Sequence, residues 1–210
     1  MKKIEVKPIL ISLCLIIFQS LIYLISKQIQ GTPNIIGGVI DNKIPFIVYF
    51  IIPYVIWYLM LFIVPYILYK KDKNIFTKYI LSYIIITIIS NIIFIIYPTT
   101  VIRNDLNGTN IFYIITKFIY QIDTPALNCF PSLHCGISML WILFTSNIKK
   151  ANKIKISIII ISILIMLSTL FIKQHVFIDL ISGNIIAILI YLFLIKNKKL
   201  TDKTKELLKI

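Results

Sequence analysis

The sequence predicts an all-α integral membrane protein with six transmembrane helices and an interfacial helix in the outer loop between spans three and four. Hydrophobic residues make up 59% of the 210 residues and charged residues only 14%, whereas soluble proteins average roughly 25% charged. A soluble domain of this size could not bury so much apolar surface, and roughly 20 apolar residues in a helix cross a bilayer. The predicted spans are residues 8–26, 45–69, 79–97, 132–148, 154–172 and 176–195.

Spans five and six come from one apolar run, residues 154–195, which is interrupted by Lys173, Gln174, His175 and Asp179. As a single helix this run would be about 63 Å long, about twice the thickness of the hydrocarbon core. We therefore predict a turn at residues 173–175. The run of residues 111–120 is apolar and aromatic but too short to cross, which predicts an interfacial or re-entrant helix.

The lysines predict the topology. Of the 22 basic residues, 17 lie before span one, between spans two and three, between spans four and five, and in the tail. With six spans these four stretches face one side, which the positive-inside rule makes cytoplasmic. We expect a single domain over residues 1–210 in the cell membrane, with both termini and the charged tail 196–210 in the cytoplasm. Because topology accounts for the net charge of +14, we expect no nucleic-acid partner.

Polar residues gather at the outer ends of three predicted hairpins, between residues 97 and 183. This arrangement brings together side chains that are separated in the sequence, and it leaves them at one face of the membrane. The residues concerned are Arg103, Ser132, His134, Ser168, Lys173, His175 and Asp179.

The two histidines, which are the only ones in the chain, suit proton transfer and nucleophilic attack. Asp179 lies four residues after His175, so its carboxylate can accept a hydrogen bond from one ring nitrogen and leave the other free to attack. His134 lies in the first turn of span four, where free N–H groups and the Ser132 hydroxyl can hold a phosphate, and it can protonate a leaving group. The alternative is a structural hydrogen bond for His175 and a helix cap at Ser132.

Two cations are candidates for binding phosphate. Arg103 is the only arginine beside 21 lysines, and its planar guanidinium binds phosphate oxygens in pairs. Lys173 can join it only if the chain turns between Lys173 and His175. Cys129 and Cys135 lie on the same outer side, where a disulfide is conceivable, although free thiols are favoured in a chain with three cysteines.

These motifs resemble those of the type 2 phosphatidic acid phosphatase superfamily, which are K-x6-R-P, P-S-G-H and S-R-x5-H-x3-D. Residues 131–134 match the second motif with leucine for glycine, and Ser168, His175 and Asp179 match the third with threonine for arginine. Arg103 alone matches the first motif. The departures are similar to the branch that includes inositol phosphorylceramide synthases, in which Lys173 would replace the missing arginine.

The resemblance implies a reaction without metal or other cofactor. His175, supported by Asp179, would form a phosphohistidine, and His134 would protonate the leaving group, while Arg103, Ser132, Ser168 and Lys173 would surround the phosphate. We expect a phosphatase acting on a lipid phosphate of the outer leaflet, of the phosphatidic acid or polyprenyl diphosphate type. A phosphotransferase that uses an alcohol is the alternative. A haem protein, a transporter and a scaffold for lipid enzymes are more remote alternatives.

Overall fold

Five helices are long and apolar enough to cross a membrane in the computed structural model, which describes residues 5–149 and 152–210. Their sequences contain long runs of isoleucine and leucine with few charges, so that no face of these helices is strongly polar. This confirms the predicted class, an all-α membrane protein. The five helices are α1 (Val6–Ile29), α3 (Ile51–Lys71, which follows the 3-10 turn η1, Val48–Phe50), α4 (Lys73–Ile96), α7 (Asn152–Phe171) and α8 (Phe177–Lys196).

Shorter elements connect these helices. Two of them are apolar helices, α5 (Ile111–Ile122) and α6 (Leu133–Ser146). Helix α6 has 14 residues, so it is shorter than the predicted fourth span, 132–148. The remaining elements are α2 (Val39–Lys43), α9 (Lys198–Leu208) and the strands β1 (Asn34–Ile35) and β2 (Thr99–Thr100), which pair in parallel with Asn34 opposite Thr99.

Polar side chains set where several helices begin. Asp72 caps α4 by accepting from the backbone N–H groups of Asn74 and Ile75, and Asn110 caps α5 in the same way. Ser132 caps α6. Because free N–H groups at a helix start need acceptors, these residues fix the first turn of each helix. The predicted break between spans five and six is also present, since α7 ends at Phe171 and α8 begins at Phe177.

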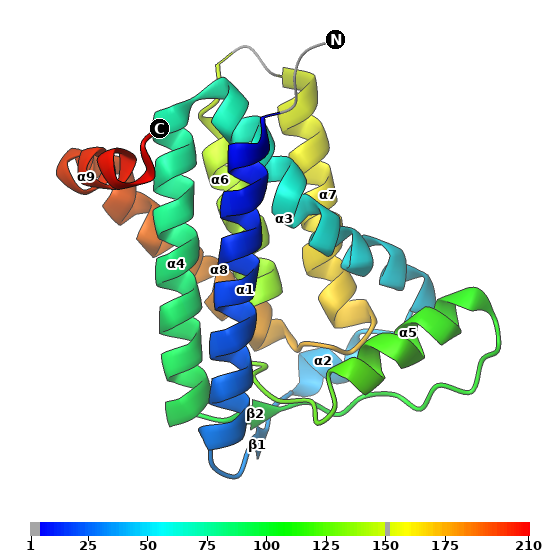
Figure 1. Ribbon diagram of the computed structural model, residues 1–210. Helices are drawn as coiled ribbons and strands as arrows, with labels where there is room; N and C mark the ends of the chain where they lie inside the picture. The colour runs from blue at the N-terminus through cyan, green and yellow to red at the C-terminus, as the bar shows by residue number, and fades with distance from the viewer. Residues whose placement is uncertain (1–4, 150–151) are drawn as a thin grey trace.

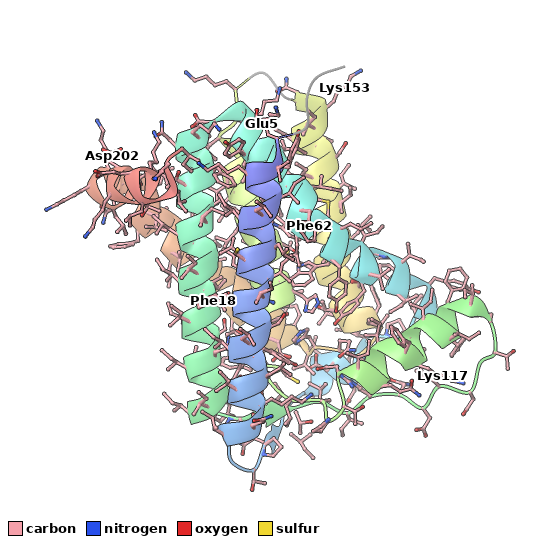
Figure 2. The ribbon with its side chains drawn as sticks, viewed as in Figure 1. Glu5, Phe18, Phe62, Lys117, Lys153 and Asp202 are labelled. Carbon is pink, nitrogen blue, oxygen red and sulfur yellow. The ribbon has the colours of Figure 1, made fainter. Side chains whose placement is uncertain are left out.

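The two ends of the helix bundle differ. The described ends of the chain, the α3–α4 connection and the start of α7 lie at one end (Figure 1). Glu5 and Lys153 mark this end in Figure 2, and Lys117 on α5 lies at the other. Helices α2 and α5 and the β1–β2 pair also lie at that second end (Figure 1). The described parts of the lysine-rich segments thus lie toward the end of the bundle opposite α5.

The outward faces of the long helices carry apolar side chains. Leu21, Ile63, Ile92 and Leu189 are 47–60% exposed, as expected of side chains that contact lipid. Inside the bundle, aromatic residues of α4 and α6 pack together, and the buried Trp141 indole donates a hydrogen bond to the Tyr79 hydroxyl at 3.0 Å. Helix α6 therefore lies inside the bundle, packed on α4, α7 and α8.

Two glycines permit the close crossing of α6 and α8. A Cβ atom added at Gly183 would overlap the backbone carbonyl of Ser132 and lie 3.2 Å from the backbone nitrogen of Gly136. A Cβ added at Gly136 would lie 3.0 Å from the carbonyl oxygen of Gly183. At the same crossing the Ser132 N–H donates to the Asp179 carbonyl at 3.1 Å. The starts of α6 and α8 are thus held in direct backbone contact.

Candidate active site

A cavity of about 320 Å³ is lined by residues of α1, α3, α5, the α5–α6 loop, the start of α6 and the turn before α8. His134 and His175 both line it. Their ring centroids are 5.9 Å apart, and the rings are inclined by 57°. The structure therefore brings the two histidines of the chain together at one cavity, as the sequence predicted.

His175 is oriented by the turn that precedes α8. The carbonyl of Thr169 accepts from the backbone N–H groups of both Gln174 and His175, each at 3.0 Å. Asp179, in the first turn of α8, is completely buried, and its Oδ2 lies 3.1 Å from His175 Nδ1. The same oxygen accepts from the Val176 N–H at 3.0 Å. His175 lies just before α8 rather than on the helical face that the spacing suggested, but the predicted contact with Asp179 is present.

His134 has aromatic neighbours instead of a carboxylate. Its ring stacks on Tyr54 with centroids 4.7 Å apart, and the Trp57 ring lies 4.1 Å away. Tyr58 approaches edge-on at 6.3 Å. His134 Nε2 is buried and has no hydrogen-bond partner in the part of the chain that the structure describes. This nitrogen is available to a ligand.

The two predicted serines lie outside the lining of the cavity. The Ser132 hydroxyl accepts from the Cys135 N–H at 3.3 Å as the cap of α6. The Ser168 hydroxyl is buried and donates to the Ile165 carbonyl at 2.6 Å within α7. Phosphate binding by these serines stays a prediction.

Arg103 does not line the cavity itself but contacts two residues that do. Its guanidinium donates to the Asp123 carboxylate and to the Gln174 side-chain carbonyl, and it stacks on the Tyr120 ring at 4.7 Å. Asp123 and Gln174 line the cavity, whereas Arg103 does not. Arg103, which the sequence predicted to bind phosphate, is therefore paired with the carboxylate of Asp123.

Lys173 contacts the segment around α2 instead of the cavity. Its ammonium group donates to the carbonyls of Asp41 at 2.9 Å and Ile44 at 2.6 Å, and it does not line the cavity. Partial burial lowers the pKa of this lysine. Lys173 adopts a positive φ of 53°, which produces the turn that the fold-back required. Its contacts fasten the segment around α2 to this turn, and its predicted role in phosphate binding stays a prediction.

Sequence reasoning missed several residues of the cavity. Lys27, at the end of α1, lines it and lies 3.7 Å from the Asp123 carboxylate. Tyr23, also on α1, donates to Asp123 at 2.8 Å. A signal for Lys27 was present, because it is one of the five basic residues outside the four lysine-rich stretches. No comparable signal marked Asp123 or the aromatic residues of α3.

The cysteines are unpaired: Cys14 is exposed, and Cys129 and Cys135 are buried. Burial raises the pKa of the Cys129 thiol, which disfavours the reactive thiolate. Within residues 5–149 and 152–210, no group of three His, Cys, Asp or Glu side chains could hold a metal ion. That the reaction needs no metal or other cofactor stays a prediction.

Comparison with family models identifies a match over more than half of the chain. The family model of the PAP2 superfamily, the type 2 phosphatidic acid phosphatases, matches residues 73–200. This region extends from α4 into the start of α9 and contains Arg103, His134, His175 and Asp179. No curated protein and no solved structure matches the chain. Helices α1 and α3, which contribute Lys27 and the aromatic residues of the cavity, lie before the matched region.

Proposed function

Because the chain belongs to the PAP2 superfamily, whose members are phosphatases or phosphotransferases, we propose that it is a membrane phosphatase that hydrolyses a lipid phosphate through a phosphohistidine. The observation that carries this proposal is the pair of histidines at one cavity, one bound to a buried carboxylate and one without a carboxylate partner. Such unequal surroundings suit unequal roles, a nucleophile and a proton donor. Family membership also favours an enzyme over a haem protein, a transporter or a scaffold.

In the first half-reaction, His175 attacks phosphorus through Nε2, because Nδ1 faces Asp179. A bond forms between nitrogen and phosphorus while the bond from phosphorus to the lipid oxygen breaks. His134 gives its proton to the departing oxygen. Asp179 stabilises the positive charge that develops on the ring of His175.

In the second half-reaction, a water molecule attacks the phosphohistidine. His134 takes a proton from the water as its oxygen bonds to phosphorus, and the bond from phosphorus to His175 breaks. Inorganic phosphate leaves, and both histidines return to their starting states. Lipid phosphate and water are the only reactants that this cycle consumes.

A lipid substrate fits the lining of the cavity. Apolar side chains of Leu24, Ile119, Ile122 and Leu133 line it beside the two histidines. A phosphate attached to an acyl or prenyl chain can therefore place its charged group at the histidines and its chain against apolar walls. Phosphatidic acid and polyprenyl diphosphate are the substrate types we propose.

We propose six membrane crossings, with α6 as the fourth. Its 14 residues are fewer than a lipid-exposed helix needs, but its neighbours α4, α7 and α8 shield it from lipid. Six crossings return both termini to one side, which the lysines make cytoplasmic. The cavity then faces the outer leaflet, and α5 lies along that interface.

The alternative is transfer of the phosphoryl group to an alcohol. Tyr54, Trp57 and Tyr58 surround His134 with aromatic rings, which limit the access of water and offer surfaces on which an alcohol such as a polyol can stack. An alcohol and water would then compete for the same phosphohistidine.

The test is an assay of the purified chain in detergent, with and without EDTA, on phosphatidic acid and polyprenyl diphosphate. Free phosphate and new lipid products are both measured, with and without alcohol acceptors. We expect His175→Ala to lose turnover on every substrate, and His134→Ala to keep some on p-nitrophenyl phosphate, whose leaving group needs little protonation. Full turnover by His175→Ala would exclude His175 as the nucleophile.

A further inference from the structure

The Asp123 carboxylate is surrounded by donors from separate parts of the chain. Arg103 Nη2 donates to Oδ2, and the Tyr23 hydroxyl donates to Oδ1 at 2.8 Å. The Lys27 ammonium lies 3.7 Å from Oδ1. A guanidinium, an ammonium and a hydroxyl around one point are the donors that bind the oxygens of a phosphate dianion.

We propose that Lys27 and Arg103 form one binding site for a phosphate dianion, and that the Asp123 carboxylate occupies this site until the substrate phosphate displaces it. This inference rests on the proposed function, and it assigns the second cation of the site to Lys27. Lys27 is the lysine that the described structure places in the wall of the cavity.

Charge supports the displacement. Asp123 brings one negative charge to two cations, which leaves an excess of one positive charge at the site. A phosphate dianion brings two negative charges and a third oxygen, so it matches the cations and the Tyr23 hydroxyl better than the carboxylate does. If Asp123 stayed in place, it would repel the phosphate at short range.

Asp123 also has a path out of the site. It follows the last residue of α5, and its side chain is 28% exposed. Rotation of the side chain toward the surface frees the cations without moving a helix. We therefore expect the exchange to require only local motion.

Arg103 keeps its position when the carboxylate leaves. Its Nη1 donates to the backbone carbonyls of Tyr120 and Asp123, both at 3.3 Å, and Nη2 also contacts Gln174. The Tyr120 ring stacks on the guanidinium. Asp123 therefore acts as a competitor for the cations rather than as the support of Arg103, and these two roles predict opposite effects of its removal.

The experiment measures binding of inorganic phosphate to the full chain in detergent. The rise in unfolding temperature with phosphate, against chloride at equal ionic strength, gives an apparent Kd. We expect Asp123→Asn to bind phosphate about tenfold more tightly, because it removes the negative charge that competes for the cations. We expect Lys27→Gln to bind phosphate about tenfold more weakly, because it removes one charge-assisted hydrogen bond to the anion. Lys27→Arg, which keeps the charge, should stay within about twofold of the wild type.

The controls are the same substitutions at two exposed positions, Lys43→Gln at the end of α2 and Asp105→Asn in the segment before α5, which should leave the apparent Kd unchanged. Weaker phosphate binding by Asp123→Asn would show that Asp123 supports Arg103, which overturns the displacement. A Kd for Lys27→Gln equal to that for Lys43→Gln would overturn the assignment of Lys27. If Asp123→Asn does not fold, Asp123→Ser tests the displacement with the same two outcomes.

These measurements need no turnover, so they separate the inference from the proposed function. If Asp123→Asn binds phosphate more tightly and Lys27→Gln more weakly than the wild type, but the chain hydrolyses no lipid phosphate, the proposed function is refuted and the anion site is supported. If the chain hydrolyses a lipid phosphate but the two variants do not change the apparent Kd for phosphate in these directions, the anion site is refuted and the function is supported.

Discussion

Replacing Gly183 by alanine tests whether the crossing of α6 and α8 sets the spacing of the two histidines. The added Cβ would overlap the Ser132 carbonyl oxygen, and carbon and carbonyl oxygen normally approach to about 3.3–3.6 Å. Removing the overlap requires α8 to move from α6 by on the order of 1 Å. The neighbours are backbone atoms, so a side-chain rotation cannot relieve it.

This movement should separate His175, just before α8, from His134, in the first turn of α6. A displacement of about 1 Å at reacting groups costs roughly 100-fold in rate, and overpacking costs about 1–3 kcal/mol of stability. We therefore expect Gly183→Ala to fold, to unfold at a lower temperature, and to lose about 100-fold in kcat/KM.

The assay is hydrolysis of a lipid phosphate in detergent, with thermal unfolding measured on the same preparations. Gly31→Ala is the matched control, because a Cβ there meets nothing within 4 Å, and it should retain both activity and stability. A folded Gly183→Ala protein with activity within about threefold of wild type would refute the dependence of the site on this crossing.

Two further predictions concern aromatic residues at the site. Trp57→Leu removes a ring that lies 4.1 Å from His134 and that stabilises a charged imidazole by about 1 kcal/mol. We expect turnover of lipid phosphate to fall about fivefold. Turnover of p-nitrophenyl phosphate should fall less, because the leaving group of this substrate needs little protonation. Equal losses on both substrates would contradict this role of Trp57. Burial raises the pKa of Tyr120 from 10.0 to about 12, so the stability it contributes is complete below pH about 10 and is lost as the pH rises toward 12. Tyr120→Phe lacks the hydroxyl that donates to the Ile172 carbonyl at 2.6 Å, and the difference in unfolding free energy between wild type and variant should shrink over this range; a constant difference would contradict the assignment.

The length of the apolar runs and the placement of charge were sufficient to predict most of the helices. Long apolar runs limited by lysines, such as the one that ends at Lys70 and Lys71, mark membrane helices because lipid excludes charge. The fourth predicted span, 132–148, is longer than α6, because the apolar sequence continues beyond the last residue of the helix. The polar break at residues 173–175 was predicted correctly, since a single helix through it would have been too long.

The candidate site was predictable where its residues are neighbours in the sequence. His175 and Asp179 are four residues apart, and a local turn brings them together. The contact between Lys27 and Asp123 joins residues almost a hundred positions apart, which no local pattern reveals. Lys173 was predicted as a phosphate ligand because the resemblance leaves an arginine to be replaced and the chain turns near it. Its ammonium group contacts the carbonyls of Asp41 and Ile44, and phosphate binding by Lys173 stays a prediction.

The cavity is built from two portions of the chain that differ in their relation to the PAP2 superfamily. The matched region, residues 73–200, carries both histidines and Asp179, whereas Lys27, Tyr54 and Trp57 come from α1 and α3 before it. The groups around the histidines can therefore differ between relatives while the histidines and Asp179 stay the same. A chimera that carries α1 and α3 from a relative should keep the contact between His175 and Asp179 but change the phosphate affinity and the surroundings of His134, because these helices supply Lys27, Tyr54 and Trp57.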